Sequence, residues 1–259
     1  MALPKITYPT YTTTIPSTGE PITYRPYNNG EEKILLTAFQ GEELVDIVNA
    51  TKHVISTCYY DLDVDTLTSY DIDFLFLQLR IKSVSNFSEL SYRNMECEKE
   101  GGQPCQRAVN IRIKLDDIKV QQYNPELETY IEYAPVKNSK NQIKLDDKIG
   151  VFMKHPGFAE QEILSNIENP TEEDLIKACI TAVYDEEAVY TRDEFSSDEL
   201  DEFYAALHPL TKEKFKEFID NIPTLRYETT FKCKECGGEH VIFESGCSKC
   251  LDCGSSNCG

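Results

Sequence analysis

Cys233-Lys-Glu-Cys236-Gly237 and Cys250-Leu-Asp-Cys253-Gly254 lie near the C-terminus and carry the sharpest chemical signal in the sequence. Four thiolates in two Cys-x-x-Cys pairs suit the tetrahedral coordination of Zn²⁺. The glycine after each pair lets the backbone turn tightly, so that nearby amide groups can face the sulfurs. The residues between the pairs are enough for a short hairpin. We therefore predict a zinc ribbon over residues 229–259, with Cys233, Cys236, Cys250 and Cys253 as its ligands.

The predicted zinc is structural, because four thiolates fill the position that a catalytic zinc leaves open. So short a segment buries little apolar surface, whereas a thiolate zinc site supplies on the order of 10 kcal/mol at neutral pH. The alternative is a disulfide cluster in a secreted tail. The choice of ligands also stays open. Cys247 and Cys258 are alternates, since Cys247-Ser-Lys-Cys250 is another Cys-x-x-Cys pair.

Composition narrows the class of protein. The chain has 259 residues, 40% of them hydrophobic, which is enough for a real core. Its net charge of -19 argues against nucleic acid as the main partner and favours contact with basic protein surfaces. The apolar runs are too short to cross a bilayer, so we expect no membrane contact. Residues 1–19 lack the basic start and apolar segment of a signal peptide. We therefore expect folding in a reducing cytoplasm, where clustered cysteines favour metal.

Hydrophobic patterns alternate between the periods of helices and strands, which predicts an α+β fold. The expected helices span residues 31–57 (broken near Gly41), 71–84, 158–167, 171–184, 197–207 and 211–222. The expected strands form a hairpin over residues 3–27, two pairs at 89–96 with 107–115 and 142–145 with 150–154, and a last strand at 225–231. Asp71 or Ser69 is the expected N-cap of the helix at 71–84, and Thr171 that of the helix at 171–184.

These elements divide the chain into two expected domains. Residues 1–228 form the mixed main domain, with a helical subregion at about residues 158–223. Residues 229–259 form the zinc ribbon.

No motif in the sequence indicates an enzyme. It contains no phosphate-binding glycine loop, no Gly-x-Ser-x-Gly elbow and no His-Glu-x-x-His pair. Asp61, Asp63 and Asp65 alternate as in a calcium loop, but Thr66 and Ile72 stand where glycine and glutamate are required. We expect a solvated acidic loop there. We therefore predict no catalytic residues and no cofactor other than structural Zn²⁺.

Four cysteines lie outside the ribbon. Cys97 and Cys105, between two expected strands, are weak candidates for half of a second metal site, and the alternative is a decayed knuckle that binds no metal. Cys58 and Cys179 fall on expected helices, and we predict that both are buried thiols.

Several stretches spread over most of the chain resemble one known family. Among them are Leu3-Pro-Lys-Ile-Thr-Tyr-Pro-Thr-Tyr11, Tyr24-Arg-Pro-Tyr27, Asp71-Ile-Asp-Phe-Leu-Phe-Leu-Gln-Leu-Arg80, Ile149-Gly-Val-Phe-Met-Lys154 and Phe231-Lys-Cys-Lys-Glu-Cys-Gly237. They are similar to the baseplate family of T-even-like contractile-tailed phages, whose members are hub subunits or hub assembly proteins. The resemblance implies a non-enzymatic virion protein of the tail baseplate, made in the host cytoplasm and working in a multi-subunit assembly. Its implied partners are other baseplate, hub or tape-measure proteins.

The chain departs from this family in two places. Family members have a cysteine knuckle after the Lys-Ser-Val segment, where this chain has Cys97 and Cys105 without a Cys-x-x-Cys pair. The family usually ends in a short tail rich in leucine and aromatic residues, whereas this chain has Glu244-Ser-Gly-Cys-Ser-Lys-Cys-Leu-Asp-Cys-Gly254. That segment looks like the terminal zinc ribbon of vitamin-B12-dependent ribonucleotide reductases, from which we take only the ribbon architecture. Two other functions stay open. One is a transient assembly chaperone for tape-measure or hub proteins, and the other is a zinc-ribbon regulator that binds nucleic acid.

Overall fold

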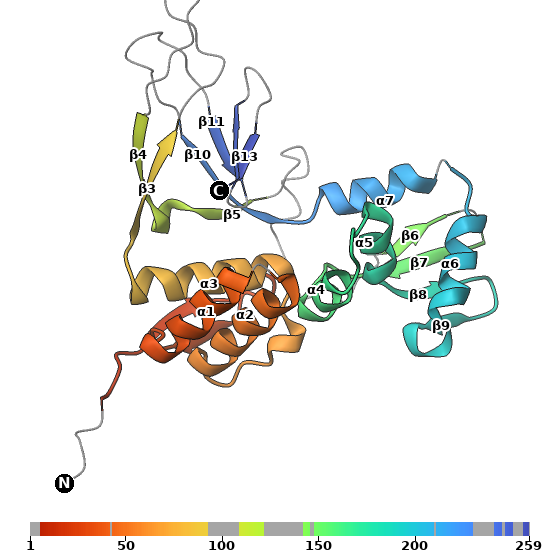
Figure 1. Cartoon of the computed structure of the whole chain (residues 1–259). Coiled ribbons are helices and arrows are strands. Elements are labelled where there is room, and N and C mark those ends of the chain that lie inside the picture. The colour runs from red at the N-terminus through yellow and green to blue at the C-terminus, as the bar shows by residue number, and fades with distance from the viewer. Residues whose placement is uncertain are drawn as a thin grey trace, which may run out of the picture. The chain divides into compact units, whose positions relative to one another are not determined.

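The computed structural model describes residues 6–41, 43–92, 109–121, 142–145, 148–209, 211–229, 241–244, 247–250 and 256–258 (Figure 1). Helices alternate with antiparallel strands in small sheets, which confirms the predicted α+β fold. The chain forms two compact units: Met1–Phe76 with Gln122–Ile222, and Leu77–Gln121 with Pro223–Gly259. The division between residues 228 and 229 remains a prediction, and it falls within strand β10, Thr224–Thr229.

The described helices follow the apolar periodicity closely. They are α1 Asn29–Gly41, α2 Leu44–Cys58, α3 Ser69–Ser83, α4 Phe158–Ser165, α5 Glu172–Cys179, α6 Ser197–Ala206 and α7 Thr211–Asp220. The predicted break near Gly41 is confirmed, because α1 ends there. Thr171 caps α5 as predicted, since its hydroxyl accepts a hydrogen bond from the Asp174 amide. The cap prediction for α3 is wrong: the helix begins at Ser69, so both Ser69 and Asp71 lie within its first turn and neither is the residue before it.

The described strands form four antiparallel sheets. The first two are hairpins, β1 Tyr11–Thr14 with β2 Pro21–Tyr24 and β3 Phe87–Tyr92 with β4 Val109–Lys114. The third has the order β6 Gln142–Lys144, β7 Gly150–Met153, β8 Ile180–Tyr184 and β9 Val189–Thr191. The fourth has the order β13 Ser256–Cys258, β12 Cys247–Cys250, β11 Val241–Glu244, β10 and β5 Lys119–Gln121. The hairpins expected at both ends and in the middle of the chain are therefore confirmed.

The helix predicted over residues 171–184 is wrong in its second half. The helix ends at Cys179, and β8 begins at the next residue and pairs with both β7 and β9. Ile180 is 1% exposed and Val183 is partly buried, so the β-branched side chains of β8 serve as core residues of a sheet. Pairing with strands distant in sequence outweighs the local helical pattern here.

The β1–β2 hairpin belongs to the first unit and is held there by stacked tyrosines. Tyr24 is 1% exposed, and its ring centroid lies 4.9 Å from that of Tyr59 and 5.8 Å from that of Tyr11. The Tyr59 hydroxyl donates a hydrogen bond of 2.8 Å to the Leu75 carbonyl in α3. Burial raises the pKa of Tyr59 well above its usual value, so the hydroxyl remains a donor. The stack thus connects β1, β2, α2 and α3.

A buried aspartate joins the same hairpin to the start of α3. Asp71 is fully buried, and its oxygens accept hydrogen bonds from the Ser17 amide (2.8 Å), the Thr68 amide (3.0 Å) and the Thr68 hydroxyl (2.7 Å). Ser17 lies in the turn between β1 and β2, 54 residues away in sequence. Asp71 therefore fixes the hairpin turn and the first turn of α3 together.

The remainder of the first unit packs helices onto the β6–β9 sheet. Its buried core consists of Leu145, Val151, Met153, Ile176, Cys179, Ile180, Leu200, Tyr204 and Phe215. The segment that follows β7 contacts the start of α3, where the Ser69 amide donates a 2.6 Å hydrogen bond to the Pro156 carbonyl. His155 lies beside two rings there, 5.6 Å from Tyr70 and 5.4 Å from Phe218. Burial lowers the pKa of His155 to about 4, although the nearby Asp71 opposes this.

Candidate functional site

The register of the C-terminal strands places three of the candidate cysteines in two different rows, where a row is a set of residues directly opposite one another on neighbouring strands. Cys250 lies in a row with Val241 and Thr229, at the end of the sheet where β10 ends and β11 begins. Cys247 and Cys258 are direct partners in the opposite row, next to Glu244. The two rows are three positions apart along β12, a distance of about 10 Å at the usual rise of a strand.

The other candidate ligands fall outside the described residues: Cys233, Cys236, Cys253, Cys97 and Cys105. In sequence, the first two belong to the connection between β10 and β11, and Cys253 belongs to the connection between β12 and β13. Both connections join strands at the row that contains Cys250. Among the side chains that the structure describes, no group of three or more His, Cys, Asp or Glu is placed to hold a metal. Zinc binding therefore remains a prediction.

The two cysteines expected to be buried are confirmed as such. Cys58 and Cys179 are both fully buried free thiols. Burial raises the pKa of each to about 12, so neither forms the thiolate that nucleophilic or metal chemistry requires.

The acidic loop predicted at residues 61–65 is also confirmed. Asp61, Asp63 and Asp65 are exposed, and Asp63 accepts a hydrogen bond of 3.1 Å from the Asp65 amide at the start of a short 3-10 turn, Val64–Thr66. Lys52 forms an ion pair with Asp65. These contacts are those of a capped, solvated loop.

Buried carboxylates elsewhere in the first unit are occupied by structural contacts. Glu31 accepts two hydrogen bonds from the Arg25 guanidinium, of 2.6 and 3.0 Å, and one of 2.7 Å from the Asn28 amide. Glu160 accepts a hydrogen bond from the Gly157 amide and pairs with Lys154 at 2.7 Å. Each carboxylate is matched by donors, so both stabilise turns and helix starts.

Several features of the first unit are suited to contact with other proteins. Within the described strands, β1 pairs with β2 alone, whereas the other edge of β2 bonds the backbone of residues 58–60. An open strand edge can add to a neighbour's sheet. Exposed apolar side chains occur at Ile6 (77% exposed), at Leu36 and Phe39 on α1, and at Leu44, the first residue of α2. No described helix is both long and apolar enough to span a bilayer.

Comparisons with known proteins identify the family of the chain. Neither the curated proteins nor the solved structures gave a match. The family described as T4 bacteriophage base plate protein matches residues 8–250, which reach from the N-terminal hairpin to Cys250. So long a match covers parts of both compact units. The chain therefore belongs to the T4 bacteriophage base plate protein family and is a structural protein of a multi-subunit assembly in the virion tail.

Proposed function

We propose that the chain is a hub subunit or hub assembly protein of the baseplate that works by binding neighbouring proteins and turns over no substrate. The observation that carries this proposal is the family match over residues 8–250. Among the described strands β1 pairs with β2 alone, and this edge and the exposed apolar residues of α1 support the proposal, because such surfaces serve protein contacts. The net charge of -19 favours basic protein neighbours over nucleic acid.

Within this role we assign structural Zn²⁺ to Cys233, Cys236, Cys250 and Cys253. The strand register supports this set, because both connections that carry these residues leave the sheet at the row containing Cys250. The alternates Cys247 and Cys258 lie in the opposite row. Thiolate ligands suit zinc, and the bound metal would fix the two connections to each other. The resulting ribbon would be a small, rigid module that binds a neighbouring baseplate protein.

Two experiments separately test whether the chain is a permanent hub subunit and whether the zinc ribbon is needed for docking. Mass spectrometry of purified virions distinguishes a hub subunit, present in fixed copy number, from a transient chaperone, which is absent.

A chain truncated before Cys233 should fold in its main domain but fail to enter baseplates. A full-length Cys247→Ser, Cys258→Ser variant is the matched control and should assemble normally. Normal assembly of the truncated chain would refute the docking role of the ribbon.

A further inference from the structure

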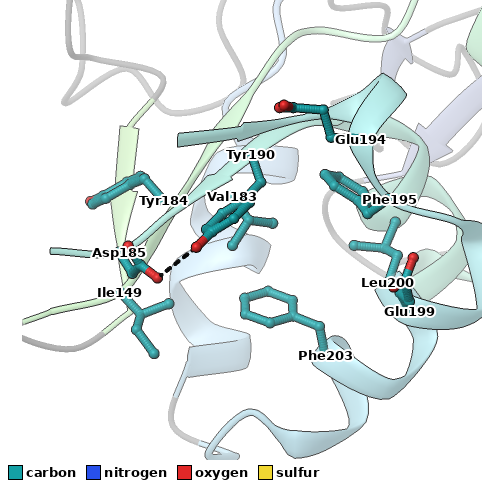
Figure 2. Close-up of a pocket in the computed structure, with 10 residues that line it drawn as sticks. All are labelled: Ile149, Val183, Tyr184, Asp185, Tyr190, Glu194, Phe195, Glu199, Leu200 and Phe203. Atoms are coloured by element: carbon teal, nitrogen blue, oxygen red, sulfur yellow. Dashed lines mark hydrogen bonds between the residues drawn. The ribbon is translucent and has the colours of Figure 1, made fainter. Parts of the chain in front are cut away.

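A solvent-open pocket of about 470 Å³ lies in the first unit, between the β6–β9 sheet and α6 (Figure 2). Its apolar wall comes from the two neighbouring strands β8 and β9, from the turn before β7, and from α6. Figure 2 shows the rings of Tyr190, Phe195 and Phe203 around the open space, with Asp185 at one side. This volume is in the range of sites that bind small groups.

The polar groups of the pocket are predominantly acidic. Asp185, Glu194 and Glu199 line it, and none of its ten lining residues is basic. Hydrogen bonds from neighbouring amides lower the pKa of all three carboxyls, so they are ionised at neutral pH. The bonds to Glu194 and Glu199 use only one oxygen of each carboxylate, Oε2. The pocket therefore combines negative charge with aromatic faces, the two features that attract an organic cation.

The chain itself places a cation against one of these rings. The Arg192 guanidinium lies 5.1 Å from the centroid of the Phe195 ring and donates a hydrogen bond to the Phe195 carbonyl. Arg192 does not line the pocket. The pocket wall is thus compatible with guanidinium stacking.

The strand next to the pocket supplies a place for peptide backbone. Tyr190 belongs to β9, the outer strand of the sheet, and all three residues of β9 are exposed. Among the described strands, β9 pairs with β8 alone. An extended segment could pair with β9 and place a side chain near Tyr190.

We infer that this pocket binds an arginine or lysine side chain from an extended segment of a neighbouring baseplate protein. The inference rests on the proposed docking role for the identity of the neighbour. The preference for a cation rests on the pocket alone and can be measured on the purified chain.

The test is an NMR titration of the full-length, ¹⁵N-labelled chain with N-acetyl-arginine amide. We expect shifts confined to residues around Tyr190, Glu199 and Phe203, with a dissociation constant on the order of 1 mM, as a ligand of this size can reach. N-acetyl-citrulline amide has nearly the same shape without the charge, and it should bind at least about tenfold more weakly. Added salt should weaken the arginine probe and leave the citrulline probe unchanged.

A double variant, Glu194→Gln with Glu199→Gln, removes two charges from the pocket. Each of these residues closes a capping box, with Thr191 and Ser196 respectively, and glutamine can fill the same position. The variant should therefore stay folded and bind the arginine probe at least about fivefold more weakly. Asp174→Asn is the matched control, because Asp174 closes the capping box of α5 but does not line the pocket. It should bind the probe like the parent chain.

Three results would overturn the inference: equal binding of the arginine and citrulline probes, shifts outside the pocket or none, and undiminished binding by the double variant. These results leave the hub role intact, because it is tested on virions. Conversely, a chain that binds arginine but is absent from virions keeps the pocket inference and is a transient assembly protein, not a permanent hub subunit.

Discussion

Two sets of short strands invite comparison: the β1–β2 hairpin near the N-terminus, and β11–β13, which extend the fourth sheet beyond β10 near the C-terminus. Their strands have only three or four residues, and isolated hairpins are marginally stable in water. The first sheet is supported by other parts of its unit, through the Tyr24–Tyr59 stack and the hydrogen bond from Ser17 to Asp71. The last strands contain three cysteines, and we propose that zinc gives the support there. Short strands need stabilisation from outside themselves, and we propose that the two ends of this chain obtain it in different ways, from tertiary packing and from a metal.

The largest effect should follow from breaking the proposed metal site. Cys233→Ser should lose zinc and leave β11–β13 without hydrogen-exchange protection, because a thiolate site contributes on the order of 10 kcal/mol. The β1–β2 hairpin should keep its protection. Elemental analysis and hydrogen exchange measure both effects, with Cys247→Ser as the control that retains the metal. One zinc per chain in the Cys233→Ser variant would contradict the ligand assignment.

The next largest effect concerns the buried support of the first sheet. Asp71→Ala removes the acceptor for the Ser17 and Thr68 amides and should lower the free energy of unfolding by about 3 kcal/mol. Urea unfolding followed by circular dichroism measures the loss. Asp46 lies in the first turn of α2 but is exposed, so Asp46→Ala should change stability by less than about 1 kcal/mol. Equal losses in the two variants would show that burial of Asp71 is unimportant.

A smaller effect should appear in the pH dependence of the free energy of unfolding, through the buried His155 near Asp71. The unfolded chain protonates His155 near pH 6.5, whereas burial lowers the pKa of His155 to about 4 in the folded chain. Its contribution to stability is therefore complete above pH 6.5 and declines as the pH falls towards 4, by on the order of 2–3 kcal/mol. Unfolding measured across this range should show the slope, and His155→Phe should reduce it. Replacing the exposed His53 with glutamine is the control and should leave the slope unchanged.

The smallest effect tests a single hydrogen bond of the aromatic stack. Tyr59→Phe keeps the ring against Tyr24 but removes the donor to the Leu75 carbonyl. We expect a loss of about 1–2 kcal/mol, because the buried carbonyl loses its partner. Chemical denaturation measures it. No change would mean that stacking alone anchors the hairpin.

The sequence predicts most elements whose signals are local. The hairpin turn around Gly19, the break at Gly41 and the capping residue Thr171 all depend on neighbours within a few residues, and the structure has each of them. The strand β8 was missed because its identity depends on β7, which is distant in sequence. Asp71 was recognised only as a helix-start residue, since nothing local reveals its bond to Ser17.

The two candidate sites differ in the same way: the zinc site has a local sequence signal, whereas the pocket depends on residues distant in sequence. The cysteine pairs that predict zinc are visible as sequence spacing, yet the choice among six cysteines depends on strand register. The acidic–aromatic pocket was missed entirely, because it joins residues from β8, β9 and α6. The signal that was available is the pair of capping boxes, Thr191 with Glu194 and Ser196 with Glu199, which place two carboxylates on consecutive turns. Finding the pocket also requires knowing that β9 lies beside α6.

Gly150 lies so close to Tyr184 that the residue at position 150 influences where the Tyr184 ring can lie, and Tyr184 lines the pocket. A Cβ atom at position 150 would lie 2.0 Å from the Tyr184 hydroxyl oxygen, so any other residue there forces the ring to move. Tyr184 lines the pocket, but Gly150 does not. The methyl group of Gly150→Ala would displace the Tyr184 ring, which changes the shape of the cavity without altering its charge. Exchanges at position 150 thus offer a way to retune which side chain the pocket accepts while every lining residue stays the same.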